Sequence, residues 1–269
     1  MKGPCFAQNH LTFRFFCQFF CQKTAYLKEI VSTLSHTQLA ADGYYTIEGA
    51  ISAVQCDQLL AQIQTASRLN QGSIRSSKGT VYAARNLIDC LDDLVPLVQS
   101  TGLDSHLKRA IGNDCGLVRV LYFDKPSDRS WSLPFHKDLT IAVQDNSLPT
   151  EHFSKPTRKS GVDHVEASEQ LLQNMLTLRI HLDEVTDANG PLQVIPGSHQ
   201  SGKTVVAYDR EAVKILVDRG DVLAMRPMIA HGSGHTDPDK QLHRRILHLE
   251  FCGTPDLPDG YQCKHFLNV

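Results

Sequence analysis

Short apolar runs dominate the second half of the chain. They are separated by clusters of Gly, Pro, Asn and Asp, which are turn-forming residues. The runs lie at residues 117–123, 139–143, 176–182, 192–195, 204–208, 221–225 and 244–251. Each has the length of a strand, and many short strands divided by turns are typical of a sandwich, a jelly roll or a barrel. The pattern therefore predicts a mainly β core over residues 117–251.

A different pattern precedes this core. Leu and Ile recur at helical spacing, so residues 24–110 are expected to be mainly helical, with a break at Pro96. Polar residues fill the stretch 144–173, and an insertion of this length without apolar runs predicts a lid or binding loop. A single domain over residues 24–269 accommodates all these parts.

Composition and charge exclude several classes of protein. The net charge of -2 and the pI of about 6.7 leave no broad basic field for nucleic acid. No apolar run reaches the roughly 18 residues that span a bilayer, so stable membrane insertion is not expected. Residues 11–22 are aromatic but interrupted by Arg14, Gln18 and Gln22, and residues 1–23 are therefore expected to form a poorly ordered extension. The alternative is an interfacial helix that touches a membrane. The eight cysteines include no CxxC pair, which favours free thiols and a cytoplasmic location.

His136 and Asp138 form a His-x-Asp triplet in LPFHKDLTIAV. Residues i and i+2 of an extended chain project to the same face, so one imidazole and one carboxylate can converge on a metal ion. The triplet alone is weak evidence, because it arises often by chance and a lone histidine is more often a surface or hydrogen-bonded core residue. A further ligand must therefore come from another part of the chain.

His231, in AMRPMIAHGSGHT, is the candidate for that ligand. The apolar strand after the turn at Arg219-Gly220-Asp221 is expected to carry His231 at its end. The alternative is a histidine that faces solvent in a loop. Two histidines and one carboxylate leave coordination positions open, as in iron(II) oxygenases, whereas a structural zinc site is closed by four protein ligands.

Arg244 and Arg245 begin the last predicted strand, RRILHLEF. Adjacent strand residues point to opposite faces, so one of the two can face the interior beside the metal. A buried guanidinium is costly unless it meets an anion, and a dicarboxylate co-substrate would provide one. The alternative is a pair of surface arginines.

Four motifs, in this order, resemble those of the phytanoyl-CoA dioxygenase family: LPFHKDLTIAV, HLDEVTDANGPLQVIPGSHQSG, AHGSG and RRILHLEF. The resemblance covers the chain from about Thr37 to Phe251. It implies a double-stranded β-helix, which is a cupin-like jelly roll, with N-terminal helices packed outside one sheet. It also implies that His136, Asp138 and His231 bind Fe(II), and that 2-oxoglutarate and O₂ are co-substrates.

The resemblance also implies that Ser233 and Arg244 bind the distal carboxylate of 2-oxoglutarate. Arg244 is preferred over Arg245 because it opens the strand, as the family's arginine does, although its distance along the chain from the metal-binding histidine is longer than usual in the family. Arg179 and Tyr122 are further candidates to contact 2-oxoglutarate.

The implied activity is hydroxylation of an unidentified small molecule, with release of succinate and CO₂. Lys125 and His164 are candidates of second rank in this site. One alternative is a non-catalytic cupin-like binding module, against which Asp138 and an interior arginine argue. Another is a hydrolase that uses zinc-bound water, for which no general base is evident. The sequence leaves the substrate and the oligomeric state open.

Overall fold

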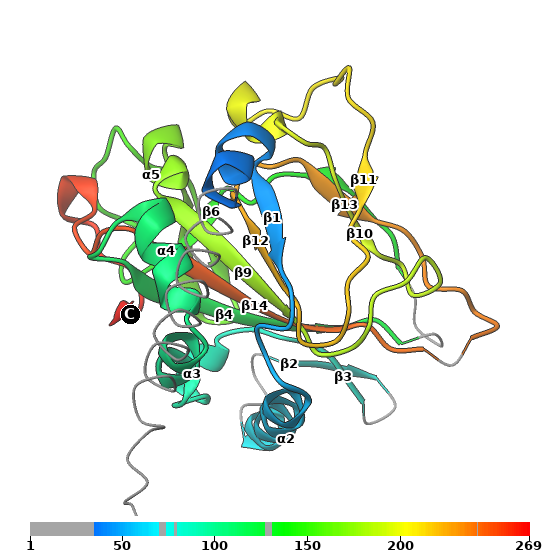
Figure 1. Cartoon of the computed structure of the whole chain (residues 1–269). Coiled ribbons are helices and arrows are strands. Elements are labelled where there is room, and N and C mark those ends of the chain that lie inside the picture. Colours follow the sequence, from blue (N-terminus) through cyan, green and yellow to red (C-terminus); the bar gives the residue numbers. More distant parts are fainter. Residues whose placement is uncertain (1–34, 70–73, 78–79, 127–130, 241) are drawn as a thin grey trace, which may run out of the picture. The chain divides into compact units, whose positions relative to one another are not determined.

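In the computed structural model the described residues are 35–69, 74–77, 80–126, 131–240 and 242–269 (Figure 1). Residues 38–269 form one compact unit, and the other unit, residues 1–37, lies almost wholly outside the described residues. The N-terminal extension expected at residues 1–23 and the domain boundary expected at residue 24 also fall outside them, so both stay predictions.

A large antiparallel sheet carries most of the fold. Its strand order is β1-β12-β9-β14-β4-β3-β2, and β15 pairs with β4. These strands are β1 (Tyr44–Ile47), β2 (Ile74–Ser77), β3 (Thr80–Ala84), β4 (Gly116–Asp124), β9 (Met175–His181), β12 (Val222–Met225), β14 (Arg245–Cys252) and β15 (Leu267–Asn268). The runs predicted at 117–123, 176–182, 221–225 and 244–251 are thereby confirmed as strands.

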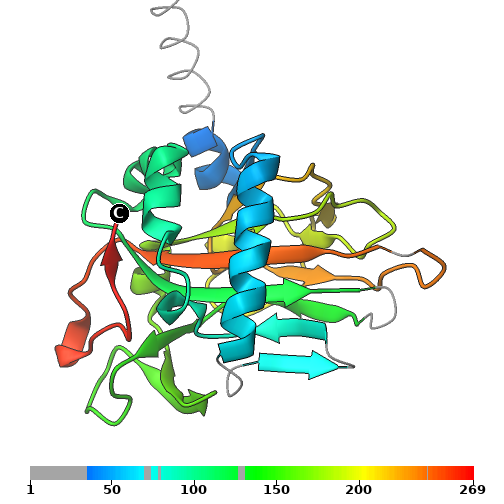
Figure 2. The same ribbon diagram turned by 90° about the horizontal axis from the view of Figure 1, so that it is seen from below.

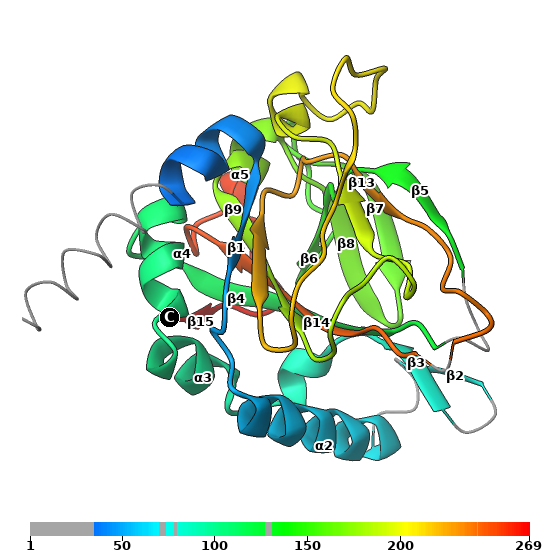
Figure 3. The same ribbon diagram turned by 45° about the vertical axis from the view of Figure 1, so that its right-hand side comes forward.

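Two smaller antiparallel sheets complete the β structure. The first has the order β11-β10-β13-β5, and the second β6-β8-β7. Their strands are β5 (Leu133–His136), β6 (Thr140–Val143), β7 (Ser154–Lys159), β8 (Val162–Glu166), β10 (Leu192–Val194), β11 (Val213–Lys214) and β13 (His231–Ser233). The sheet that contains β13 lies on the opposite side of the large sheet from the helices (Figures 1 and 3).

Helices cover one face of the large sheet (Figure 2). They are α2 (Ala53–Leu69), the 3-10 turn η2 (Leu87–Asp89), α3 (Leu94–Ser100) and α4 (Leu103–Ile111). The short elements α5 (Glu169–Gln173), η4 (Ser198–Ser201) and η5 (Pro258–Gly260) lie in the connections. Successive side chains of a strand point to opposite faces of the large sheet, so one set faces the helices and the other set faces the smaller sheets. Leu176, Leu178 and Ile180 of β9 join the helix-side core, whereas Arg179 lies on the other face, also buried.

This arrangement confirms the mainly β fold with helices outside one sheet. The region expected to be mainly helical, 24–110, also contains β1, β2 and β3, so that expectation was too broad. A helix at residues 35–42 ends before Gly43, whose φ of 86° turns the chain out of it. The two tyrosines, the threonine and the isoleucine of β1 follow. The strand then pairs with β12, a partner that no local pattern reveals.

Pro96 does not break a helix, contrary to the prediction. It lies in the first turn of α3, where the backbone N–H has no intrahelical acceptor, so the missing donor costs no hydrogen bond. The run 204–208 was also predicted as a strand, and it pairs with no strand in the described structure; the short strand β11 follows it instead. Val205 and Val206 are exposed there. A strand forms when its side chains are buried against a neighbouring strand, and β-branched residues alone are not sufficient.

The lid-like insertion expected at residues 144–173 is largely regular structure. It contains β7, β8 and α5, and β8 pairs with β6. Ser160 and Gly161 connect β7 to β8 with φ of 49° and 80°, which are the positive values of a two-residue hairpin turn. Strand β7 is polar because it is an exposed edge strand, and this polarity made the segment resemble a loop.

Candidate metal centre and its surroundings

Two histidines face each other across a pair of short strands. His136 ends β5, His231 begins β13, and the two are register partners with ring centroids 4.3 Å apart. His231 was predicted to end the apolar strand that is β12, but it begins a separate strand, β13. The next residue, Gly232, permits the close approach, because a Cβ there would lie 2.8 Å from the Leu133 carbonyl oxygen.

Backbone carbonyls fix the orientation of both rings. His136 Nδ1 donates to the Pro134 carbonyl oxygen at 2.9 Å, and His231 Nδ1 donates to that of Ile229 at 2.9 Å. A carbonyl can only accept, so both Nδ1 atoms carry the proton. Both Nε2 lone pairs are thereby left available, which is the arrangement in which neutral imidazoles bind metals.

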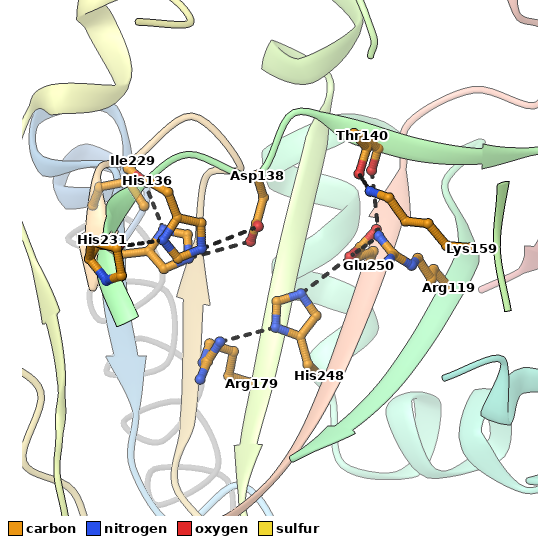
Figure 4. A network of polar contacts seen from close by, with 11 residues as sticks. Arg119, His136, Asp138, Thr140, Lys159, Arg179, Ile229, His231, His248 and Glu250 are labelled. Carbon is orange, nitrogen blue, oxygen red and sulfur yellow. Dashed lines mark hydrogen bonds and ion pairs between the residues drawn. The ribbon is translucent and has the colours of Figure 1, made fainter. Parts of the chain in front are cut away.

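Asp138 completes the group. It lies between β5 and β6, and its backbone N–H donates to the Pro227 carbonyl oxygen at 2.9 Å. Its Oδ1 lies 3.9 Å from His136 Nε2, and its Oδ2 lies 3.5 Å from His231 Nε2 (Figure 4). One ligand atom from each of the three residues lies within 4.8 Å of the others.

The protonation states suit metal binding. Burial acts to raise the pKa of Asp138, but His231, His248 and His136 outweigh it, and the pKa lies below its ordinary value. Burial lowers the pKa of His231 to about 4, against the opposing influence of Asp138. An ionised carboxylate beside a neutral imidazole is the state that metal coordination requires.

The donor set fits iron(II). Within the described part of the chain no fourth His, Cys, Asp or Glu joins the triad. The side chains of His136 and Asp138 are 37% and 35% exposed, so one side of the group is accessible, whereas that of His231 is 3% exposed. Two nitrogens and one carboxylate with an open side match a non-haem iron site rather than a closed zinc site.

Three buried cations lie near this centre. Arg244 is 5% exposed, and its Nε and Nη1 have no hydrogen-bond partner among the described residues. Lys125 is fully buried, and its Nζ donates to Ser233 Oγ at 3.0 Å and to the Gly234 carbonyl at 2.8 Å. Arg179 is buried too, and its Nε also lacks a partner. The described residues place no carboxylate within ion-pair distance of any of the three.

The three charges act on one another. Burial, and then Arg179, lowers the pKa of Arg244 to about 9. Burial, and then Arg244 and Arg179, lowers the pKa of Lys125 to about 7. Cations without a carboxylate partner are costly in a poorly solvated interior, and an anion bound among the three would reduce that cost.

Strand β14 begins at Arg245, so Arg244 directly precedes the strand instead of opening it as expected. Arg245 points away from the cation cluster, as the alternation of side chains in an extended chain predicts. Its Nε donates to Asp183 Oδ2 at 2.8 Å, and its backbone N–H donates to the same oxygen at 2.9 Å. This guanidinium already has an anionic partner. Of the two candidate arginines, Arg244 is therefore the one that lies in the cation cluster.

Not every candidate residue reaches the site. Tyr122 packs in the core between the large sheet and the helices, so the structure does not bring it near the triad. His164 lies in β8, buried, with its Nδ1 donating to the Val162 carbonyl at 2.9 Å. Two residues that were not singled out, His248 and Glu250, lie near Asp138; the alternation of polar and apolar residues in RRILHLEF was their signal.

Known proteins share this architecture. A family model described as phytanoyl-CoA dioxygenase (PhyH) matches residues 39–242. The iron/alpha-ketoglutarate-dependent dioxygenase okaE of Penicillium ochrochloron is 41% identical over 74 residues, which are 28% of this chain and 24% of that relative, so the match spans about a quarter of the relative's length.

Two solved structures have the same fold. EctD from S. alaskensis superposes with a TM-score of 0.60 at 17% identity, over 87% of this chain and 85% of its own. The epimerase SnoN from nogalamycin biosynthesis superposes with a TM-score of 0.58 at 16% identity, over 86% of this chain and 87% of its own.

Proposed function

The chain belongs to the phytanoyl-CoA dioxygenase family, and on that premise we propose that it is an Fe(II)- and 2-oxoglutarate-dependent dioxygenase acting on a small molecule. One observation carries this proposal. An open two-histidine, one-carboxylate triad lies near a cluster of buried cations that have no carboxylate partner among the described residues. The triad has the ligands for a metal ion, and the cation cluster has the charge to bind a dianionic co-substrate.

Each group of the chain has a defined task. His136, Asp138 and His231 would hold the iron, and Arg244 would bind the distal carboxylate of 2-oxoglutarate together with Ser233. When bound, iron, 2-oxoglutarate and O₂ supply an oxidant for a C–H bond, with succinate and CO₂ as by-products. The protein positions the reactants and keeps water from the reaction. The burial of Arg244 contributes to both the positioning and the exclusion of water.

Hydroxylation is the proposed outcome at the C–H bond. The relative okaE supports oxidation dependent on alpha-ketoglutarate (2-oxoglutarate), whereas SnoN is an epimerase on the same fold. The fold therefore does not choose between outcomes, and hydroxylation is the simplest result of oxidising a C–H bond. The alternative of a non-catalytic cupin-like module leaves the buried cations without a purpose.

Three features of the chain as a whole bear on its partners and its location. The net charge of -2 offers no broad field for nucleic acid. No described helix combines the length and the apolar character needed to cross a membrane. Five described cysteines are free, which supports the proposed cytoplasmic location.

Metal analysis and succinate release test the proposal together. Purified protein is loaded anaerobically with Fe(II), and succinate is measured after 2-oxoglutarate and O₂ are added. We expect one iron per chain, and succinate formation that depends on iron and oxygen. Protein that binds zinc in preference to iron and forms no succinate with any compound of a substrate panel would refute the assignment.

A further inference from the structure

A chain of buried polar contacts lies beside the proposed metal centre (Figure 4). It begins at Arg179 on β9, whose Nη1 donates to His248 Nδ1 on β14 at 3.1 Å. His248 Nε2 lies 3.4 Å from Glu250 Oε1. Glu250 in turn accepts from Arg119 Nη1 on β4, at 3.1 Å to Oε1 and 3.4 Å to Oε2.

Sheet register explains this alignment. Arg179 and His248 are cross-strand partners, and so are Glu250 and Arg119. His248 and Glu250 are two apart on β14 and therefore share the face opposite the helix-side core. Four polar residues on three adjacent strands thus make one continuous row, with each member at most 9% exposed.

The row has two functional ends. At one end Arg119 Nη1 lies 3.5 Å from the carbonyl oxygen of Thr140, two residues after the metal ligand Asp138. At the other end Arg179 belongs to the cation cluster, and its Nε has no partner among the described residues. The row therefore connects the chain segment of a metal ligand to an unsatisfied guanidinium.

The contacts also restrict the His248 ring. Arg179 can only donate, so His248 Nδ1 must accept and carries no proton. In the neutral ring the proton then lies on Nε2, which is 3.4 Å from Glu250 Oε1 but forms no hydrogen bond with a described residue. Arg119 balances the charge of that carboxylate. A side chain as long as arginine otherwise has many rotamers, and the hydrogen bond to His248 restricts the orientations open to Arg179.

We propose that His248, supported by Glu250 and Arg119, is a positioning residue that holds Arg179 as a second binding arm for the co-substrate, beside Arg244. The inference rests on the proposed function, because it assumes that the anion in the cluster is 2-oxoglutarate. His248 itself touches neither the co-substrate nor the metal in this scheme; it acts through Arg179.

A double-mutant cycle tests the proposal. Protein loaded with Ni(II) is titrated with 2-oxoglutarate by calorimetry, in the unmodified form and as His248→Leu, Arg179→Met and the double variant. A hydrogen bond to a charged group is lost in each case, so either single change should raise the Kd roughly tenfold or more. The double variant should bind no more weakly than Arg179→Met alone, because His248 acts only through Arg179.

Two further variants separate this role from a general loss of structure. His248→Gln keeps an acceptor for Arg179 and a donor for Glu250, so it should recover most of the affinity. His106→Leu is the control, because His106 is a partly buried histidine of α4 that contacts Tyr45. It should leave the Kd unchanged. Should His248→Leu fold poorly, Glu250→Gln tests the same row.

The outcomes distinguish the two levels of the argument. Unmodified protein that binds Ni(II) but not 2-oxoglutarate would overturn the proposed function. If it binds 2-oxoglutarate, and His248→Leu binds equally well, His248 has no positioning role. Additive losses in the double variant would also overturn the proposal, because they would mean that His248 acts independently of Arg179.

Discussion

Replacing Arg244 with methionine should weaken co-substrate binding without lowering the stability of the unliganded protein. Methionine preserves much of the apolar volume of the side chain but removes its charge. The loss of a buried charged contact to 2-oxoglutarate costs ~2–5 kcal/mol, which corresponds to a roughly 30-fold to several-thousand-fold rise in Kd. Without 2-oxoglutarate, however, Arg244 is 5% exposed and two of its nitrogens lack partners, so its removal should leave the stability unchanged or raise it.

Arg245→Met is the matched control, at the next residue of the chain, where β14 begins. Arg245 forms an ion pair with Asp183, whose side chain is 18% exposed. Breaking this half-buried pair should lower the stability of the unliganded protein by about 1–2 kcal/mol, with solvent screening keeping the loss small. The affinity for 2-oxoglutarate should stay within about twofold of the unmodified protein, which is below the free energy of any direct charged contact.

Calorimetric titration of the Ni(II)-loaded variants gives the affinities, and thermal unfolding with and without 2-oxoglutarate gives the stabilities. The unmodified protein should be stabilised by the ligand, and Arg244→Met should lose most of that stabilisation. A larger loss of affinity in Arg245→Met would mean that the strand phase is wrong by one residue. A clearly destabilised unliganded Arg244→Met would mean that the guanidinium already has a partner.

Three other predictions concern the same centre. His136→Ala, Asp138→Ala or His231→Ala should abolish iron binding and 2-oxoglutarate decarboxylation while the protein stays folded; activity that survives any one change removes that residue from the triad. The pKa of Lys125 is lowered to about 7, so its charge is present below that pH and lost above it. The Kd for 2-oxoglutarate should therefore rise between pH 6 and 9, and Lys125→Met should flatten this pH dependence of the Kd. Turnover in excess chloride or bromide, analysed by mass spectrometry, should give oxidised product without halogen, because Asp138 fills the coordination position that a halide would need; a halogenated product would contradict its role as a ligand.

The strand that carries Arg179 could be predicted from the sequence because its pattern of polar and apolar residues is unambiguous. In β9, polar Thr177, Arg179 and His181 alternate with three apolar residues, and the structure places the two sets on opposite faces. The triad was found for a different reason. A carboxylate two residues after a histidine is a local signal, whereas the pairing of β5 with β13 that brings in His231 is a long-range contact that the motif order only implied.

Tyr122 shows where such reasoning fails. Strand β4 is buried on both faces, so apolar residues occupy nearly every position and the period of two is hidden. An irregularity in its pairing with β14, between Glu250 and Phe251, also changes which side chains of β4 face the helices. A tyrosine in such a strand can face either side, and here burial among the helix-side core residues raises its pKa and keeps it from the site.

The balance of buried charges favours the proposed function over a non-catalytic cupin-like module, and this argument does not depend on family membership. The whole chain carries a net charge of -2, so composition gives no hint of a positive site. On the inner face, however, Glu250 is paired with Arg119, and Asp138 belongs to the proposed metal triad. Arg244, Lys125 and Arg179 then remain without a carboxylate of their own in the described structure. A fold that only needed stability would gain by replacing these side chains with apolar ones. Their retention beside an open metal site is explained when an anion and a metal ion bind together, and a cupin-like module without a co-substrate gives no such reason.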